Sequence, residues 1–195
     1  LTEREKLKID PTKTHILNVG LWTEGKNQKE GIEVARLLEN SHPDLHFHFI
    51  GNQAENFESY WKPIMENLPS NVTVWGERND VDSFMIACDV MMFNSVWECN
   101  PLVIRESINY GMKIIARNFS HYMGMFDNYI TPIETNDCLN ISNQLLKLIS
   151  SDKTYEIENQ KDFGKDLLSF YDEVLKIEKY NNNPIENDYV IKQHF

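Results

Sequence analysis

Short apolar runs alternate with amphipathic stretches along the first two thirds of the chain. The apolar runs predict strands near residues 15–20, 46–51, 71–76, 89–94, 112–116 and 129–133. Between them, apolar residues at helical spacing predict helices over residues 27–40, 54–68, 81–87 and 101–110. Strands that are apolar almost throughout and alternate with helices form parallel sheets covered on both faces. We therefore predict an α/β fold, a doubly wound and mostly parallel sheet of about six strands.

The two ends of the chain differ from this pattern. Residues 1–13 are mostly charged and end in the turn-forming pair Asp10-Pro11, so they are predicted to be a linker. Two further helical stripes, within residues 140–149 and 163–177, are followed by a polar tail that has no period. The predicted organisation is therefore a linker at 1–13, one domain at 14–180 and a tail at 181–195.

Loops that follow the predicted strands are expected to meet at one edge of the sheet. In an open parallel sheet, ligands bind outside the carboxyl ends of the strands. This edge should be formed by residues 20–26, 51–53, 76–79, 94–100 and 117–121. We expect the functional residues of the chain to lie in these loops.

Composition and charge exclude several classes of protein. The 195 residues carry 19 Lys and Arg against 30 Asp and Glu, a net charge of −11. This balance argues against a nucleic-acid-binding protein, because affinity for nucleic acid comes from clustered cations. No apolar run approaches the ~20 residues that a membrane-spanning helix needs.

The cysteines and the N-terminus indicate the compartment. The three cysteines, Cys88, Cys99 and Cys138, are odd in number and lack CxxC spacing, which is typical of reduced thiols in the cytoplasm. The residues after Leu1 are charged and cannot form the apolar core of a signal peptide. Because the chain begins with Leu rather than Met, we expect it to be a processed product or a fragment of a longer chain. A cytoplasmic location is predicted, and contact with a membrane surface through the rest of that protein stays open.

The stretch from Gly20 to Asn27 matches the spacing of a phosphate-binding P-loop but lacks its chemistry. It follows a predicted strand and carries Lys26 at the position of the P-loop lysine. Asn27 stands where the P-loop has the Ser or Thr that binds Mg²⁺, and Glu24 would place a carboxylate among the phosphates. A P-loop nucleoside triphosphatase is therefore not favoured, and Lys26 needs another explanation.

A second segment, residues 98–106, combines a helix start with two carboxylates. Asn100 and Pro101 predict a helix N-terminus, with Asn as the N-cap and Pro as the first helical residue. The free N–H groups of a first helical turn suit an anion. Glu98 and Glu106 would flank that anion, and carboxylates on both sides of a phosphate fit the hydroxyl groups of a nucleotide sugar. From these residues alone, an equally good interpretation is that Glu98 is a solvated loop carboxylate and Glu106 an ordinary residue on a helix surface.

The order of these motifs resembles that of a known enzyme family. The matching pieces are Val19-Gly20 with Lys26, Phe49-Ile50-Gly51, Val72-Thr73-Val74-Trp75-Gly76, Cys88-Asp89-Val90, Asn94-Ser95, Glu98-x7-Glu106 and Gly111-Met112-Lys113-Ile114-Ile115-Ala116. In this order they are similar to the C-terminal, donor-binding, Rossmann-like domain of retaining glycosyltransferases with the GT-B fold. That group includes glycogen synthase, sucrose synthase and bacterial mannosyltransferases. The resemblance covers residues 14 to 135.

The resemblance implies an enzyme of glycan biosynthesis that transfers a sugar from a nucleoside-diphosphate sugar to an acceptor hydroxyl with retention. The donor would be a UDP- or GDP-sugar bound by this chain, and the acceptor would be bound by an N-terminal domain that the chain lacks. The chain alone is therefore expected to be inactive. No metal ion and no cofactor are expected, because in this family cations and a helix N-terminus carry the charge of the diphosphate.

The resemblance also implies roles for single residues. Lys26 and Glu98 would be catalytic, Lys26 by neutralising the developing charge on the diphosphate and Glu98 by contacting hydroxyls of the transferred sugar. Glu106 would accept hydrogen bonds from the ribose hydroxyls. The remaining donor-binding residues would be Gly20 after the first strand, Gly76 and Arg78 beside the base, and Asn100, Pro101, Leu102 and Val103 with their backbone around the diphosphate.

Two residues depart from the family pattern. Leu21 stands where the family has an Arg that pairs with the lysine, and Cys99 stands where a glycine lets the backbone approach the ligand. Arg78 or Arg117 could supply the absent cation. These departures keep two alternatives open: a nucleotide-sugar-binding or interaction domain that has lost transfer, and a nucleotide-sugar epimerase of the same fold.

Two further candidates are weaker. His46 and His48 alternate along one strand and share a face, so they could bind a metal ion, but a polar strand face is the favoured interpretation. Cys99 beside Glu98 could be a nucleophile, but no base is visible near it, so we expect a packed or idle thiol.

Overall fold

The structure is a computed structural model in which residues 1–98, 100–118, 126 and 128–152 are described. They belong to one compact unit, residues 1–156, and a second unit spans residues 157–195. The helical stripe predicted within 163–177, the predicted domain boundary at residue 180 and the predicted tail lie outside the described residues.

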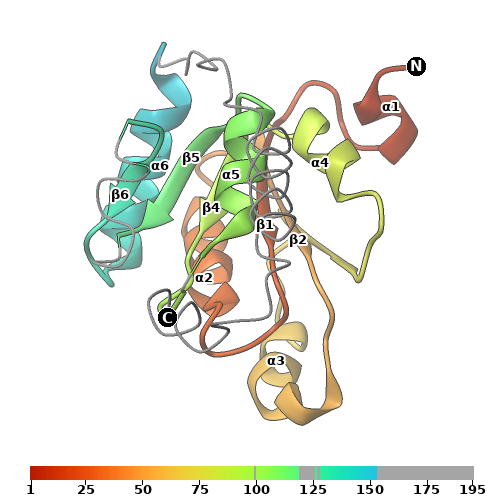
Figure 1. The fold of residues 1–195 in the computed structure, drawn as a ribbon, viewed down its shortest axis with the longest axis vertical. Helices are drawn as coiled ribbons and strands as arrows, with labels where there is room; N and C mark the ends of the chain where they lie inside the picture. Colours follow the sequence, from red (N-terminus) through yellow and green to blue (C-terminus); the bar gives the residue numbers. More distant parts are fainter. Residues whose placement is uncertain (99, 119–125, 127, 153–195) are drawn as a thin grey trace, which may run out of the picture. The chain divides into compact units, whose positions relative to one another are not determined.

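Within the described residues, six strands form one sheet, and each lies where an apolar run predicts it (Figure 1). They are β1 (Thr14–Val19), β2 (Leu45–Ile50), β3 (Val72–Gly76), β4 (Val90–Phe93), β5 (Lys113–Arg117) and β6 (Thr131–Ile133). Their order across the sheet is β3-β2-β1-β4-β5-β6, and every neighbouring pair is parallel. The predicted α/β class and parallel sheet are confirmed.

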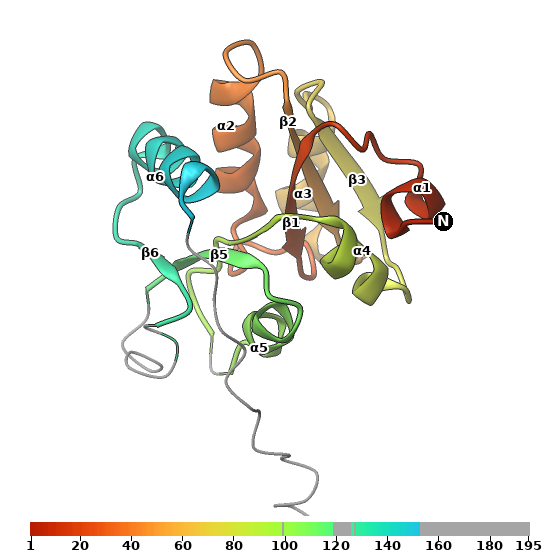
Figure 2. The same ribbon diagram turned by 90° about the horizontal axis from the view of Figure 1, so that it is seen from above.

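Helices connect the strands and cover both faces of the sheet. They are α1 (Glu3–Leu7), α2 (Gln28–Leu38), the 3₁₀ turn η1 (Glu55–Phe57), α3 (Glu58–Met65), α4 (Val81–Ala87), α5 (Leu102–Asn109) and α6 (Cys138–Ser150). In Figure 2, α2, α3 and α6 lie on one side of the sheet, and α1, α4 and α5 lie on the other. The helix predicted over 54–68 is shorter at both ends and runs through Pro63.

Two apolar cores, one on each face of the sheet, result from alternation along the strands. Ile16 belongs to the core under α2, α3 and α6, and the next residue, Leu17, belongs to the core under α4 and α5. Met91 and Met92 divide between the two cores in the same way. Because side chains alternate between the faces of a strand, a strand buried on both sides is apolar at nearly every position. This is why unbroken apolar runs identify the strands of this chain.

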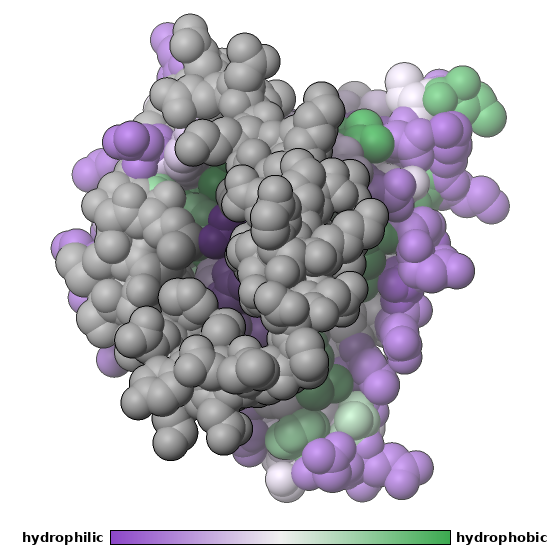
Figure 3. Space-filling model, viewed as in Figure 1, coloured by the Kyte–Doolittle hydropathy of each residue, from purple (hydrophilic) through white to green (hydrophobic). Residues whose placement is uncertain are grey.

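The segment predicted as a linker, residues 1–13, contains helix α1. Thr2 and Glu5 cap the N-terminus of this helix reciprocally. Arg4 Nη2 lies 2.8 Å from each carboxylate oxygen of Asp89, the residue before β4. Helix α1 consists of Glu-Arg-Glu-Lys-Leu and has no buried residue, so no apolar run marks it in the sequence. The right-hand side of the surface in Figure 3 is mostly hydrophilic. An ion pair between residues far apart in the chain therefore attaches the segment to the sheet.

Three histidines gather on the face of the sheet that α4 covers. Trp75 Nε1 donates to His48 Nδ1 at 3.0 Å, so the proton of His48 must lie on Nε2. His48 Nε2 then donates to His15 Nδ1 at 2.8 Å, and His15 Nε2 donates to Asp10 O at 2.7 Å. Each of these two rings donates through one nitrogen and accepts through the other, so both are neutral. His46 packs against His48 with ring centroids 4.9 Å apart.

Burial sets the pKa values of these histidines. Burial lowers the pKa of His48 from 6.5 to about 3 and that of His46 to about 4, and at His46 the positive charge of Lys13 adds to the effect. Lys13 faces His46, while the nearby Asp10 carboxylate acts in the opposite direction. Protonating His48 would also convert an acceptor of the hydrogen-bond chain into a donor. The neutral rings are therefore part of the folded state.

We predict that the folded unit loses stability as the pH falls below about 6.5. In the unfolded chain a histidine takes up its proton near pH 6.5, whereas folded His48 does so near pH 3, so the unfolded state binds more protons between these values. His48 alone should lower the free energy of unfolding by up to about 1.4 kcal/mol per pH unit in this window. Urea unfolding at a series of pH values measures the slope.

The slope should be smaller in His48→Gln and unchanged in His42→Gln, because His42 bonds to Ser41 outside the hydrogen-bond chain. Equal slopes in His48→Gln and the unmodified chain would contradict this account of the histidines.

Candidate functional site

The site predicted at the carboxyl ends of the strands coincides with the point where the sheet changes direction. From β1 the order proceeds outward through β2 and β3, whereas β4 lies on the other side of β1 and is followed by β5 and β6. The helices that follow β1 and β4 run to opposite faces, α2 to one and α5 to the other (Figure 2). Ligands of open α/β sheets bind at such a switch point. The loops that matter are therefore residues 20–27 and 94–101.

Backbone hydrogen bonds tie the loops at this edge to one another. Gly20 N donates to Ile50 O at 2.9 Å, Trp22 N to Asn52 O at 3.0 Å, Gly51 N to Gly76 O at 2.8 Å and Val96 N to Gly25 O at 2.8 Å. The loops after β1, β2, β3 and β4 therefore share one edge, as the sequence predicts. Of the fifth loop, residues 119–121 lie outside the described part of the chain.

Lys26 and Glu98 form an ion pair across the switch point. Lys26 Nζ is bonded to Glu98 Oε1, and the two side chains are 32% and 11% exposed. The stem of Lys26 lies over Gly20, and its ammonium group is 5.8 Å from the ring centroid of Phe93 at the end of β4. Glu98 occupies one of the three N–H donors of the lysine, so Lys26 can still donate to an anion. The structure thus brings together the two residues for which the sequence predicts catalytic roles.

Helix α5 begins one residue later than the sequence predicts, and the prediction of Asn100 as its N-cap is wrong. Pro101 occupies the N-cap position with φ −75° and ψ 90°, and this extended conformation delays the first helical residue to Leu102. Asn100 Oδ1 instead accepts from Arg105 Nε at 3.4 Å. Pro101 has no side-chain oxygen to cap the helix, so the N–H groups of Leu102 and Val103 keep their capacity for an anion.

Glu106 has different surroundings from Glu98. It lies on α5 one turn after Leu102, and both of these side chains are exposed. Residues four apart lie on the same face of a helix, so Glu106 stands on the solvent side of α5. Within the described residues it makes no side-chain hydrogen bond or ion pair. One carboxylate of the predicted site is therefore held by a lysine, and the other is open to a ligand.

The two arginines that could replace an absent cation beside Lys26 are each bound to a carboxylate. Arg78, in the loop after β3, lies 2.8 and 2.6 Å from the two carboxylate oxygens of Asp80. Arg117, at the end of β5, is paired with Glu30 of α2. Both guanidinium groups are therefore already engaged in the unliganded chain.

A buried polar network next to the ion pair is not among the predicted site residues. Glu30 accepts from Arg117 Nη2 and, at 2.7 Å, from Asn94 Nδ2. The Glu30 and Arg117 side chains are 7% and 11% exposed. The sequence holds one signal for this network: Glu30 lies one helical turn before the buried Val34, where the stripe of α2 would take an apolar residue.

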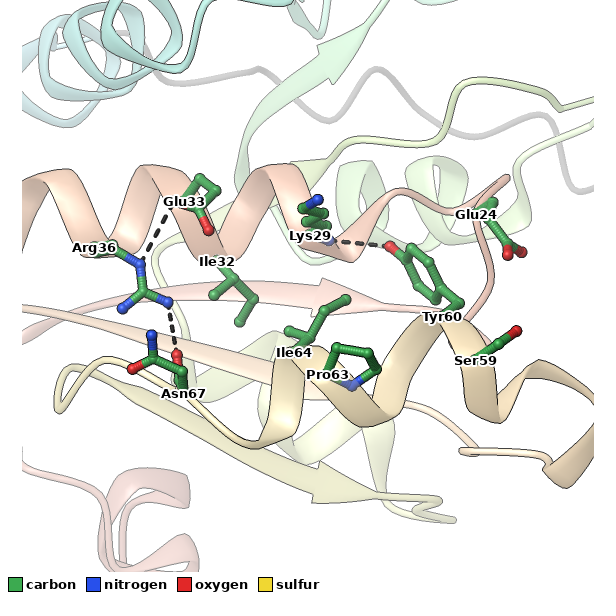
Figure 4. A pocket seen from close by; sticks show the side chains of 10 residues that line it. All are labelled: Glu24, Lys29, Ile32, Glu33, Arg36, Ser59, Tyr60, Pro63, Ile64 and Asn67. Carbon is green, nitrogen blue, oxygen red and sulfur yellow. Dashed lines mark hydrogen bonds and ion pairs between the residues drawn. The ribbon is translucent and has the colours of Figure 1, made fainter.

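The cavity shown in Figure 4 lies between α2 and α3, apart from the predicted site. It measures about 420 Å³, and none of the predicted donor-binding residues lines it. Tyr60 points its hydroxyl at the start of α2 and accepts from Lys29 N at 3.0 Å, while Arg36 Nη2 donates to Asn67 O at 2.6 Å. The cavity is thus the seam between two helices, and the polar groups that bridge it already have partners.

The weaker candidates have ordinary surroundings where they are described. Among the described residues, no group of three or more His, Cys, Asp or Glu side chains could hold a metal ion. His46 Nε2 lies 2.8 Å from Thr73 Oγ1, on the polar strand face that the sequence favours. Cys99 lies outside the described residues. In the part of the chain that is described, no helix combines the length and the apolar content that crossing a bilayer requires.

Comparison with known protein families identifies the family of the chain. Residues 1–166 match the model of a family described as glycosyl transferases group 1. The chain belongs to this family. The predicted resemblance to retaining glycosyltransferases is thereby confirmed, and the described unit of this group 1 glycosyltransferase chain corresponds to one half of a GT-B fold.

Two relatives are similar to this glycosyltransferase chain in sequence. The UDP-Gal:alpha-D-GlcNAc-diphosphoundecaprenol alpha-1,3-galactosyltransferase of Escherichia coli is 31% identical over 144 residues, which are 70% of this chain and 36% of that enzyme. The processive diacylglycerol alpha-glucosyltransferase of Acholeplasma laidlawii is 24% identical over 191 residues, which are 90% of this chain and 55% of that enzyme. The chain therefore spans between about a third and about half of the length of these relatives.

Several solved structures show the same fold. WaaG, which is involved in lipopolysaccharide biosynthesis, has a TM-score of 0.61 at 24% identity, over 76% of this chain and 41% of WaaG. HepE of Anabaena, in complex with UDP and glucose, has a TM-score of 0.66 at 19% identity, over 76% of this chain and 41% of HepE. Sucrose-phosphate synthase of Thermosynechococcus elongatus has a TM-score of 0.63 at 18% identity, over 76% of this chain and 39% of the synthase.

We predict that Gly51 tolerates no side chain, whereas Gly76 tolerates one at a modest cost. A Cβ on Gly51 would lie 1.8 Å from Gly20 O, and its φ of +153° is rarely adopted by residues with a side chain. A Cβ on Gly76 would meet no atom within 4 Å, so only its φ of +68° opposes substitution. Gly51→Ala should lower the free energy of unfolding by about 3 kcal/mol or more, and Gly76→Ala by about 1 kcal/mol. Urea unfolding compares them, and equal losses would show that the loops after β1 and β2 approach less closely.

Proposed function

We propose that this chain binds the donor of a glycosyltransferase, a nucleoside-diphosphate sugar, at the switch point between β1 and β4. The observation that supports this most directly is the pairing of Lys26 with Glu98, four residues before the start of α5. A cation, a carboxylate and uncapped helix N–H groups thereby lie at the edge of the sheet where ligands of this architecture bind.

In this proposal Lys26 and the first turn of α5 bind the diphosphate. Glu98 neutralises Lys26 in the unliganded chain, and a phosphate oxygen would take another of the lysine's N–H donors. The N–H groups of Leu102 and Val103, at the positive end of the α5 dipole, would bind a second oxygen. When the bond to the sugar breaks, negative charge grows on the diphosphate. Groups already fixed around it stabilise that charge without reorganisation.

The two carboxylates would divide the hydroxyl groups of the donor between them. Glu106, exposed and without a partner among the described residues, would accept both hydrogen bonds of the ribose diol. Glu98, beside Lys26, would contact hydroxyls of the transferred sugar. The loop from Gly76 to Arg78 would line the base. Each hydrogen bond to a charged carboxylate contributes about 1.5–3 kcal/mol when it is made in the complex.

The rest of the enzyme would bind the acceptor. The Escherichia coli relative is named for UDP-Gal and a sugar on diphosphoundecaprenol, and the Acholeplasma laidlawii relative for diacylglycerol. A HepE structure contains UDP-glucose. On this basis we propose a UDP-hexose as donor, with a GDP-sugar as the alternative, and an acceptor hydroxyl at the cytoplasmic surface of a membrane. Transfer would require the acceptor-binding part, because the reacting hydroxyl must be held next to the donor with water excluded.

A second candidate function is donor binding without transfer. The observation that favours it is Leu21, which is 38% exposed in the loop after β1 and stands where the family has a second cation. Arg78 and Arg117 are engaged with Asp80 and Glu30. With less positive charge around the diphosphate, a bound donor would react more slowly.

We predict that the chain binds UDP or GDP. Lys26→Met should lower the affinity for that nucleotide about ten-fold, because a charge-assisted hydrogen bond to phosphate is lost. Isothermal titration calorimetry with UDP, GDP and ADP measures the affinities. Lys29→Met is the matched control, since Lys29 is an exposed lysine three residues further along on α2. A folded sample that binds none of the three nucleotides at millimolar concentration would refute the donor site.

Sugar transfer by this chain alone would refute the need for a separate acceptor part.

Substitution should separate the roles of the two glutamates. Glu106→Gln should weaken the binding of the bare nucleotide and of the nucleotide sugar equally, by about 1–3 kcal/mol, because both ligands carry the ribose. Glu98→Gln should lower the affinity for the nucleotide sugar only. The affinity for bare UDP should stay the same or rise, because the substitution frees Lys26 from its neutralising partner.

Calorimetry with both ligands on both variants, with folding checked by thermal melting, measures this difference. Glu134→Gln is the control, because Glu134 is an exposed carboxylate between β6 and α6. Equal weakening of the bare nucleotide by Glu98→Gln and Glu106→Gln would show that Glu98 is wrongly assigned.

A further inference from the structure

The loop that carries Glu98 is attached at three points to helix α2 and to the loop before it. Val96 N donates to Gly25 O at 2.8 Å, Lys26 pairs with Glu98, and Asn94 Nδ2 donates to Glu30 Oε2 at 2.7 Å. Residues 94–98 belong to no helix or strand, and Val96 and Trp97 are 48% and 68% exposed. Burial of apolar side chains therefore does not hold the middle of this loop. Its position depends on the polar contacts with α2 and with residues 25 and 26 before it.

Glu30 is the buried contact among the three. Its Oε2 accepts from Asn94, and its Oε1 accepts from Arg117 Nη2. Arg117 in turn donates to Asn136 Oδ1 at 2.9 Å, in the segment between β6 and α6. The Glu30 and Arg117 side chains are 7% and 11% exposed, whereas Lys26 is 32% exposed. Water therefore competes less with the Glu30 contacts than with the Lys26–Glu98 pair.

Asn94 is itself fixed on both sides. Its Oδ1 lies 3.4 Å from Asn18 Nδ2 on β1, and Asn18 also donates to Met92 O at 2.8 Å. On the helix side, a Cβ on Gly31 would lie 3.2 Å from Asn94 Oδ1, so the absence of a side chain there lets Asn94 lie against α2. The base of the loop is thus clamped between β1 and α2, four residues before Glu98.

We infer that Glu30, through Asn94 and with Arg117 as its counter-ion, is a positioning residue of the donor site: it fixes the loop that holds Glu98 beside Lys26. Neither Glu30 nor Arg117 touches the donor in this account. The inference rests on the proposed function only for its effect on nucleotide binding, because the placement of the loop can be measured without a ligand.

The test compares two double variants that differ only at position 30. Glu30→Leu/Arg117→Leu removes both buried charges and the acceptor for Asn94. Glu30→Gln/Arg117→Leu removes both charges and keeps an amide oxygen that can accept from Asn94 Nδ2. Removing both partners avoids leaving one buried charge unpaired. Asn94→Ala, which leaves the Glu30–Arg117 pair intact, is a further variant in case the first does not fold.

Hydrogen exchange of the Val96 amide reports the position of the loop, and the Gly20 amide, bonded to Ile50 O at 2.9 Å, is the internal reference at the same edge. We expect Val96 to exchange about ten-fold faster relative to Gly20 in Glu30→Leu/Arg117→Leu and in Asn94→Ala, because the loop opens locally. Glu30→Gln/Arg117→Leu should restore the ratio. Arg4→Met/Asp89→Asn, which removes a more exposed ion pair near the start of β4, should leave it unchanged.

The affinity for UDP-glucose, or for the GDP-sugar if GDP is the nucleotide that binds, should fall about ten-fold in the Leu/Leu variant and recover in the Gln/Leu variant, because Glu98 contacts the sugar. Equal Val96 exchange in the two double variants would overturn the inference. Faster Val96 exchange with unchanged nucleotide-sugar affinity would overturn it as well, since the loop would then have no effect on the site. If the unmodified chain binds neither nucleotide, the proposed function fails, and the exchange of Val96 alone decides whether Glu30 positions the loop.

Discussion

Strand β1 pairs with β4 on one side and with β2 on the other, and this pairing determines which loops meet at the carboxyl ends of the strands. Ile16 of β1 is in register with Val90 of β4 and with Phe47 of β2. Since all strands are parallel, the connections from β1 and from β4 must leave at the same edge and return over opposite faces. Lys26 and Glu98 are 72 residues apart in the chain, and they meet because of this pairing.

The two edges of the sheet are stabilised by different interactions. Near the amino ends of β1 and β4, Arg4 is paired with Asp89, and His15 is bonded to Asp10 and His48. At the carboxyl ends, the Lys26–Glu98 pair and the Glu30 network position the residues that are candidates for binding the sugar donor. Substitution of the Arg4–Asp89 pair and substitution of the Lys26–Glu98 pair can therefore separate a loss of stability from a loss of donor binding.

The sequence predicts the sheet well because the signal for it is local. Each strand is buried on both faces, so a short apolar run is sufficient to locate it, and helix α4 is predicted with its observed bounds, Val81–Ala87. The features that it misses depend on partners far away in the chain. Helix α1 is charged and attached through Arg4 to Asp89, and Glu30 acquires its role only because Arg117 and Asn94 meet it. The N-cap of α5 is missed by one residue, since the extended Pro101 itself takes that position.

Binding of the donor between the loops after β1 and β4 can be observed by titrating the isotope-labelled chain with UDP, and then with GDP, while the amide signals are followed by nuclear magnetic resonance. The largest shifts should occur at Gly20, Lys26, Leu102 and Val103, with little change at Leu45 at the amino end of β2. Shifts confined to the cavity between α2 and α3, or to the face that carries His15 and His48, would contradict it.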